Sequence, residues 1–409
     1  MKILKISILV FLIGAMSPDA SAQFAYDPVK GCNIDGNGDC IPNTVLSAMP
    51  FLRIVPDARS GAMGDAGIAI SPTSDAMHFN ASNLVFSEND FGLSMTFTPW
   101  LTNLGLNDVY LAYLSGYKSI DDLSTVGASF RFFSLGEINF TDKEGISTGT
   151  GRPRELEAAV AYSRKLAPGF SAGITAKYIY SNLAGGQQTE LGNTISAANA
   201  FATDISVTWD KQLDITSYDS NLRIGAVMSN LGSKVSYTRD QVRDFLPGNL
   251  GIGAALDLEF DDYNMLTVAL DFNKLLLPTP VAQNILDENG VMVENPEYDE
   301  DMNNIADYRE KSLFGGVFGS FGDSQGGFGE EMSEVNISAA VEYWYARQFA
   351  IRAGYFFEHP LKGDRQFLTV GFGLKYNVYG FNLSYLVPTN NQRGPLDNTL
   401  RFTLNLDIE

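Results

Sequence analysis

Apolar and polar residues alternate along most of the chain from Phe91 to the C-terminus, in segments of about ten residues, as expected of strands that cross a membrane at a tilt. The clearest segment is the last, in which Leu400, Phe402, Leu404, Leu406 and Ile408 share one face and Thr399, Arg401, Thr403, Asn405 and Asp407 share the other. In a soluble sandwich the apolar face would meet a core, whereas in a membrane barrel it would meet lipid.

The same alternation predicts an all-β chain with fourteen antiparallel strands. They are expected near residues 91–100, 108–118, 124–133, 155–165, 170–182, 200–212, 221–229, 248–258, 265–273, 333–344, 349–358, 367–376, 379–386 and 398–408. The even count favours a transmembrane barrel, because a single-chain bacterial barrel closes with an even number of strands.

The connections between these strands support a barrel over a sandwich. Connections after the even-numbered strands are short, as at 166–169, 345–348 and 377–378. Those after the third, fifth, seventh and ninth strands are long, whereas the first connection is short. Short periplasmic turns opposite long external loops are the outer-membrane pattern, and a sandwich has no reason to show it.

The first residues predict export. Lys2 and Lys5 precede an apolar run from Ile6 to Met16, and Ala20-Ser21-Ala22 offers a cleavage site before Gln23. The run is too short for a comfortable membrane anchor, so residues 1–22 are expected to be a cleaved signal peptide. No later stretch has 18 consecutive apolar residues, and the mean hydropathy of −0.04 suits strands with alternating faces.

Charge and cysteine content exclude other classes. The net charge is −20, and clusters of Lys and Arg are missing, so no nucleic-acid partner is expected. Cys32 and Cys40 are the only cysteines and should form a disulfide outside the cytoplasm. The residues 33–39 between them partly match a calcium loop, but Thr44 stands where the bidentate Glu belongs, so a stapled turn is favoured over a metal site.

Residues 23–86 interrupt the strand pattern and predict a plug. Two prolines, Pro50 and Pro56, break any long helix, and Gly61, Gly64 and Gly67 permit close backbone approach. Fourteen strands should enclose a lumen that needs an occupant. The expected organisation is therefore a signal peptide (1–22), an N-terminal plug with a small disulfide loop (23–86) and a barrel (87–409).

The longest loop, about residues 275–332, combines acidic and apolar stretches. Its first half carries nine acidic residues: Asp287, Glu288, Glu294, Glu297, Asp299, Glu300, Asp301, Asp307 and Glu310. Apolar residues flank them, among them Leu276, Leu277, Phe314, Phe318, Phe321 and Phe328. These apolar residues either cap the barrel mouth or form a surface for a partner, since apolar patches rimmed with charge mark interaction sites.

Catalytic signatures are missing. The two histidines, His78 and His359, lie far apart in the chain, and no nucleophile elbow, zinc spacing, phosphate loop or dinucleotide fingerprint occurs. The sequence therefore predicts a protein that is not an enzyme and uses no cofactor or metal.

Three separated motifs resemble one family. Pro50-Phe51-Leu52-Arg53-Ile54 with the run from Pro56 to Gly67 resembles the plug of the PorV (LptO) family, outer-membrane proteins of the Bacteroidetes type IX secretion system. The stretches 273–280 and 318–331 resemble that family too. The plug motif comprises Pro50, Phe51, Arg53, Pro56, Asp57, Arg59, Gly61, Gly64, Asp65 and Asn80. One departure is Asn80-Ala81-Ser82, where FadL-like plugs usually have Asn-Pro-Ala.

The resemblance implies a fourteen-stranded FadL-like barrel that carries protein cargo. Such proteins bind the C-terminal signal domain of cargo that has crossed an SprA-type translocon and pass it to a PorU-type sortase. The expected location is the outer membrane, in contact with its lipid, with loops extracellular and the N-terminus on the periplasmic side. Leu276, Leu277, Phe314, Phe318, Phe321 and Phe328 are the expected partner-binding residues. The rival classes are a FadL-like transporter of hydrophobic compounds and a general porin.

Overall fold

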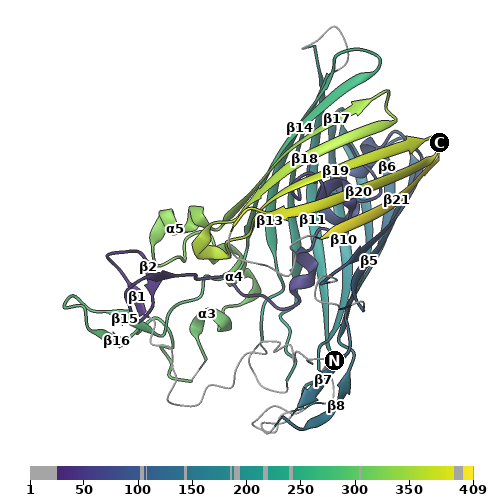
Figure 1. Cartoon of the computed structure of the whole chain (residues 1–409). Coiled ribbons are helices and arrows are strands. Elements are labelled where there is room, and N and C mark those ends of the chain that lie inside the picture. Colours follow the sequence, from purple (N-terminus) through teal and green to yellow (C-terminus); the bar gives the residue numbers. More distant parts are fainter. Residues whose placement is uncertain are drawn as a thin grey trace, which may run out of the picture.

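The computed structural model describes residues 25–101, 106, 108–141, 145–184, 187, 194–214, 220–238, 243–303, 305–390 and 399–408. The expected signal peptide lies outside these residues. The described residues form a closed antiparallel barrel with a segment inside it and a small sheet with helices at one mouth (Figure 1). None of the helices in these ranges is long and apolar enough to span a membrane.

The barrel contains fourteen strands, as the alternation predicts. They are β4 (Phe91–Pro99), β5 (Val109–Asp121), β6 (Ser124–Leu135), β9 (Arg154–Ala167), β10 (Phe170–Asn182), β11 (Ala198–Leu213), β12 (Ser220–Gly232), β13 (Asn249–Glu259), β14 (Asn264–Leu275), β17 (Val335–Tyr345), β18 (Phe349–Phe357), β19 (Gln366–Tyr376), β20 (Tyr379–Pro388) and β21 (Leu400–Ile408). Each strand pairs with its neighbours in the chain, and β21 closes the barrel on β4 with Leu404 opposite Met95.

The outer face of the barrel is apolar and the inner face is polar. On β21, Leu404 is 60% exposed, whereas Arg401 and Thr403 point inward and are buried. Near the short turns the outer face carries exposed aromatic residues, namely Trp209, Tyr263, Tyr345, Tyr376 and Tyr379. An aromatic girdle of this kind marks the level at which a barrel meets the membrane interface.

The two ends of the barrel differ, as the connection lengths predict. One end carries tight turns such as the one between β19 and β20. The other end carries the hairpin of β7 (Ile138–Thr141) and β8 (Ser147–Gly151) and the long excursion between β14 and β17. We call these the short-turn end and the long-loop end. The expected strand start at 333 shifts to Val335, because Gly327–Ser333 forms helix α5 instead.

Residues 49–86 lie inside the barrel, and we call them the lumen segment. They form η1 (Pro50–Arg53), α1 (Ala58–Gly61), α2 (Ala76–Phe79) and η2 (Ala81–Phe86). Asp57 caps α1 by accepting a hydrogen bond from the Ser60 backbone N–H. The segment contacts lumen-facing side chains on both sides of the barrel, including Thr403 on β21 and Ser206 on β11.

Glycines in the wall make room for the lumen segment. A Cβ atom at Gly354 on β18 would lie 2.1 Å from the Gly64 backbone nitrogen. At Gly64, with a φ of +60°, a Cβ atom would in turn lie 2.7 Å from the Tyr355 backbone nitrogen. Contacts at this range between two backbones need glycine on both sides, so wall and segment fit each other locally.

A second small structure covers the long-loop end. Strands β1 (Ala25–Asp27), β2 (Cys32–Ile34) and β3 (Cys40–Ile41) join β15 (Asn284–Leu286) and β16 (Met292–Glu294) in a five-stranded sheet. Helices α3 (Asp307–Glu310), α4 (Leu313–Gly319) and α5 (Gly327–Ser333) complete this structure, and η4 (Pro360–Lys362) lies in the next loop. Cys32 and Cys40 are joined by a disulfide.

This sheet places the first described residues relative to the longest loop. The prediction placed the long loops and the N-terminus on opposite sides of the membrane, but Tyr26 of β1 pairs with Ile285 of the longest loop. The first described residues therefore lie at the same end of the barrel as the longest loop. Within the predicted unit 23–86, residues 25–41 form the sheet at this mouth, whereas Ala48, Met49 and Phe51 already pack against wall strands.

Candidate functional site

A buried ionic network ties the lumen segment to the wall. Arg59 of α1 donates from Nε and Nη2 to the two carboxylate oxygens of Glu342 on β17, at 2.9 and 2.6 Å. Arg352 on β18 donates to the same carboxylate, and the Glu342 and Arg352 side chains are fully buried. Arg59 also donates to the Ser71 backbone oxygen at 2.8 Å, which holds the segment's own fold together. Two guanidinium groups thus share one carboxylate at the centre of the lumen.

Further contacts hold the rest of the lumen segment. The carboxylate of Asp271 on β14 accepts hydrogen bonds from the backbone N–H groups of Gly67 and Ile68, at 2.7 and 2.9 Å. Arg131 on β6 donates to the Phe51 and Leu52 carbonyl oxygens and to Nδ1 of His78. Because arginine can only donate, His78 is an unprotonated acceptor at this nitrogen.

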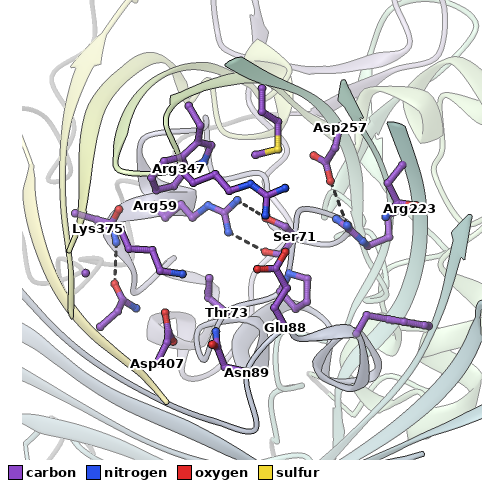
Figure 2. A pocket seen from close by; sticks show the side chains of 18 of the residues that line it. Arg59, Ser71, Thr73, Glu88, Asn89, Arg223, Asp257, Arg347, Lys375 and Asp407 are labelled. Carbon is purple, nitrogen blue, oxygen red and sulfur yellow. Dashed lines mark hydrogen bonds and ion pairs between the residues drawn. The ribbon is translucent and has the colours of Figure 1, made fainter. Parts of the chain in front are cut away.

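The lumen segment separates two cavities. On the short-turn side lies a cavity of about 370 Å³, the vestibule, which Figure 2 shows from close by. Arg347 and Lys375 lie on one side of this view, and Asp257 lies paired with Arg223 on the other. On the long-loop side a smaller cavity of about 120 Å³ lies above Ile68 and His78. The vestibule is lined by charges of both signs together with apolar side chains such as Met265, Trp344 and Leu374, so an apolar compound there would have to desolvate charged groups.

A second ionic network fastens the long-loop mouth. Lys274 at the end of β14 pairs with Glu331, at 3.0 Å, and with Glu334. Lys362 of η4 pairs with Glu330 at 2.6 Å and with Glu334 at 3.0 Å. The two later motifs of the sequence, at 273–280 and 318–331, therefore meet in space. Burial alone would raise the pKa of Glu334, but the ammonium groups of Lys362 and Lys274 outweigh it and lower the pKa.

Acid is expected to loosen this mouth. Because the pKa of Glu334 is lower in the folded than in the unfolded protein, its stabilising contribution is complete above the unfolded value of about 4.5 and is lost as the pH falls through the folded value. A nitroxide on Met332→Cys should become mobile in its electron paramagnetic resonance spectrum only once the pH has fallen below the unfolded value of about 4.5. Adding Glu334→Gln should raise the mobility already at neutral pH. A spectrum that stays constant until the whole barrel unfolds in acid would contradict this role of Glu334.

Two of the predicted partner-binding residues are misplaced. Leu276 is 0% and Leu277 is 2% exposed, and Leu277 packs with Val45 and Phe245 beneath the mouth. They anchor the loop, so their prediction as a contact surface is wrong. Phe314, Phe318, Phe321 and Phe328 are exposed, by 72%, 65%, 50% and 79%.

The plug-motif residues spread along the lumen segment. Phe51, Pro56, Asp57, Arg59, Gly61, Gly64 and Asn80 are buried, Arg53 and Asp65 are partly buried, and Pro50 is exposed at the mouth. Arg53 lies 3.5 Å from Glu358 in the loop after β18, and Asn80 donates to the Ile68 carbonyl and to Thr208 on β11. Asn80 makes these bonds without the proline usual after it.

The wall partners of the lumen segment escaped the sequence analysis. Glu342, Arg352, Asp271 and Arg131 are charged residues on the lumen faces of their strands. Their position in the sequence could have indicated this role, because a charged residue in the middle of a lumen-facing strand requires a buried partner of opposite charge. The sequence did not show which residue of the segment would supply it.

The carboxylate oxygens of Asp299, Asp301 and Asp307 lie within 4.8 Å of one another at the mouth.

The model of the family described as "Type IX secretion system protein PorV" matches residues 39–282, which is more than half of the chain. This range contains the lumen segment and the strands from β4 to β14. The chain belongs to the PorV family. The predicted family is thereby confirmed; the matched range contains the motifs at 50–67 and 273–280, whereas the one at 318–331 lies beyond it. No curated protein sequence matches the chain.

Solved structures resemble this PorV-family protein in fold. The Ralstonia pickettii toluene transporter TbuX is 12% identical, with a TM-score of 0.51, over 86% of this chain and 98% of that chain. The Pseudomonas putida toluene transporter TodX is 12% identical, with a TM-score of 0.43, over 89% and 98% of the two chains. A Pseudomonas aeruginosa FadL homologue is 11% identical, with a TM-score of 0.43, over 90% and 100%. Family and fold together assign the protein to the outer membrane and to type IX secretion.

Proposed function

We propose that this protein carries type IX cargo at the cell surface. It binds the C-terminal signal domain of a secreted protein that has left the SprA-type translocon, and it delivers this cargo to the PorU-type sortase. The long-loop end, which faces the exterior in this proposal, makes the contacts. The barrel itself conducts nothing.

The observation that carries the proposal is the occupied lumen. Between the vestibule and the cavity on the long-loop side, the segment is held by the Arg59–Glu342–Arg352 network and by Asp271. A folded or extended polypeptide has no path through cavities of about 370 and 120 Å³ that this segment separates. The most elaborate structure instead covers the long-loop mouth, where a partner can reach it.

A FadL-like transporter of hydrophobic compounds is the alternative, and its fold is the same. The lining of the vestibule argues against it, because Arg223, Asp257 and Lys375 would have to be desolvated by an apolar compound. The wall would also need an opening toward lipid, whereas every neighbouring pair of barrel strands is hydrogen-bonded in the structure.

A pull-down tests the proposal. The tagged protein is extracted from its own outer membrane in mild detergent, and everything bound to it is identified by mass spectrometry. We expect a very large translocon barrel, a sortase and secreted proteins that share a C-terminal domain. Recovery of the protein alone, with lipid or apolar compounds in its barrel, would overturn the proposal in favour of the transporter.

A further inference from the structure

Helix α4 is fixed so that its phenylalanines face outward. Ser312 caps the helix by accepting from the Gly315 N–H, and Lys311 pairs with Asp323 at 3.1 Å across the two ends of the helix. Val317 is buried, and a Cβ atom at Gly316 would lie 2.8 Å from the Phe245 ring, so this face packs tightly. Because the Gly316–Val317 face is packed against the protein, the opposite face of α4, which carries the phenylalanines, is directed toward solvent.

The outward face carries an apolar patch. Phe314 and Phe318 are one helical turn apart, and their rings stack with centroids 6.5 Å apart and planes inclined by 14°. Phe321 follows the helix and is half exposed. We define these three residues as the α4 patch. Exposed aromatic rings do not contribute the hydrophobic free energy that their burial would supply. A cluster of such rings is typical of a surface that a partner covers.

The acidic segment 297–310 adjoins the α4 patch. It leads directly into α4, and Gln325 after the helix donates to Glu297 at 3.5 Å. Within it, Asn303 donates to Asp301 and to Glu310, both at 3.0 Å, so these carboxylates gather with Asp299 and Asp307 at one place. Arg309 is engaged with Asp244, at 2.6 Å, and does not neutralise them.

We propose that the α4 patch and the acidic segment 297–310 together dock one segment of the cargo's signal domain, in which apolar side chains stand next to lysine or arginine. The rings supply the desolvated contact, and the carboxylates select a cationic partner and speed its approach. The charge of the segment decides the occupant, because an acidic or uncharged partner would gain nothing from it. This inference rests on the proposed carrier function and assigns its contact surface.

Binding of a purified cargo signal domain from the same cell tests the assignment. The full-length protein in detergent is titrated with the domain in EDTA, at about 50 and about 300 mM NaCl. We compare Phe314→Ser with Phe318→Ser as a double variant, Asp299→Asn with Asp301→Asn and Asp307→Asn as a triple variant, and Ile146→Ser as a control. Ile146 is 64% exposed and lies in the β7–β8 hairpin of another loop.

The expected results separate the two contributions. The double Phe variant should weaken binding by about tenfold or more at both salt concentrations. The triple Asn variant should weaken it by about tenfold at low salt only and flatten the salt dependence. Ile146→Ser should bind as the wild type does. Each variant is first shown to be folded by its heat-modifiable migration in gel electrophoresis.

Other outcomes decide against the assignment. If the wild type binds the domain and both variants bind equally well, the α4 patch is not the contact, while the carrier function stands. If the wild type binds no signal domain at all, the carrier function itself fails. Binding that Ca²⁺ strengthens would mean that a metal ion occupies the carboxylates, and a dimer abolished by the double Phe variant would make a second copy the occupant. Either result would overturn the proposal.

Discussion

Replacing Glu342 by Gln should lower the stability of the barrel by about 3–5 kcal/mol, because Arg59 and Arg352 would stay buried without the carboxylate that they share. The loss can be measured as a lower urea midpoint of unfolding or as a lower temperature at which the folded form disappears in gel electrophoresis. This is the largest effect that we expect from a single change of charge in the described residues.

A matched control uses a pair at the surface. Glu259 accepts a hydrogen bond from Arg347, whose side chain is 62% exposed. Glu259→Gln should cost less than about 1 kcal/mol, because solvent screens exposed pairs. Equal effects of the two substitutions would mean that the lumen network stabilises the protein no more than a surface pair does.

Replacing Gly354 by Val should dislodge the lumen segment. The new side chain would begin 2.1 Å from the backbone nitrogen of Gly64, and a backbone on each side cannot yield as a flexible side chain would. We expect either loss of the folded barrel or a folded barrel that conducts ions in a planar lipid bilayer. The wild type should not conduct.

Gly248→Ala is the control for this substitution. Its Cβ atom would lie 3.8 Å from the Leu276 side chain, an ordinary contact, so this variant should fold and stay closed. A Gly354→Val barrel with wild-type stability and no conductance would refute the claim that the close fit between wall and segment keeps the lumen shut.

The strands were predictable because each carries its own signal. In β21 the exposed Leu404 and the buried Thr403 follow directly from the alternation of side chains along a strand. The bounds of the fourteen strands therefore agree with the prediction to within a few residues, and their even number correctly predicted a closed barrel. The two-residue shift at the start of β17 has a local cause, because helix α5 includes Ser333, which the alternation assigns to the strand.

The mouth was less predictable because its residues find their partners far away in the chain. Leu276 and Leu277 look like contact residues in a loop, but Val45 and Phe245 bury Leu277 from two other segments. The pairing of Tyr26 with Ile285 spans most of the chain and leaves no periodic signal in the sequence. The partner of Arg59 was hidden for the same reason, since several lumen-facing carboxylates would have satisfied it equally well on paper.

The position of β1 to β3 constrains how the barrel is assembled. At Phe91 the chain leaves the lumen segment and becomes a wall strand at the short-turn end, yet residues 25–41 are built into a sheet beyond the opposite mouth. The lumen segment is thus held at both ends, by the wall strand β4 at the short-turn end and by the β1–β3 sheet at the long-loop end. If the barrel closed first, the disulfide-closed hairpin would have to pass through the closed barrel before residues 49–86 could occupy it. Because β21 and β4 are the last and first wall strands and pair with each other, we expect their seam to close last, around a lumen segment that is already in place.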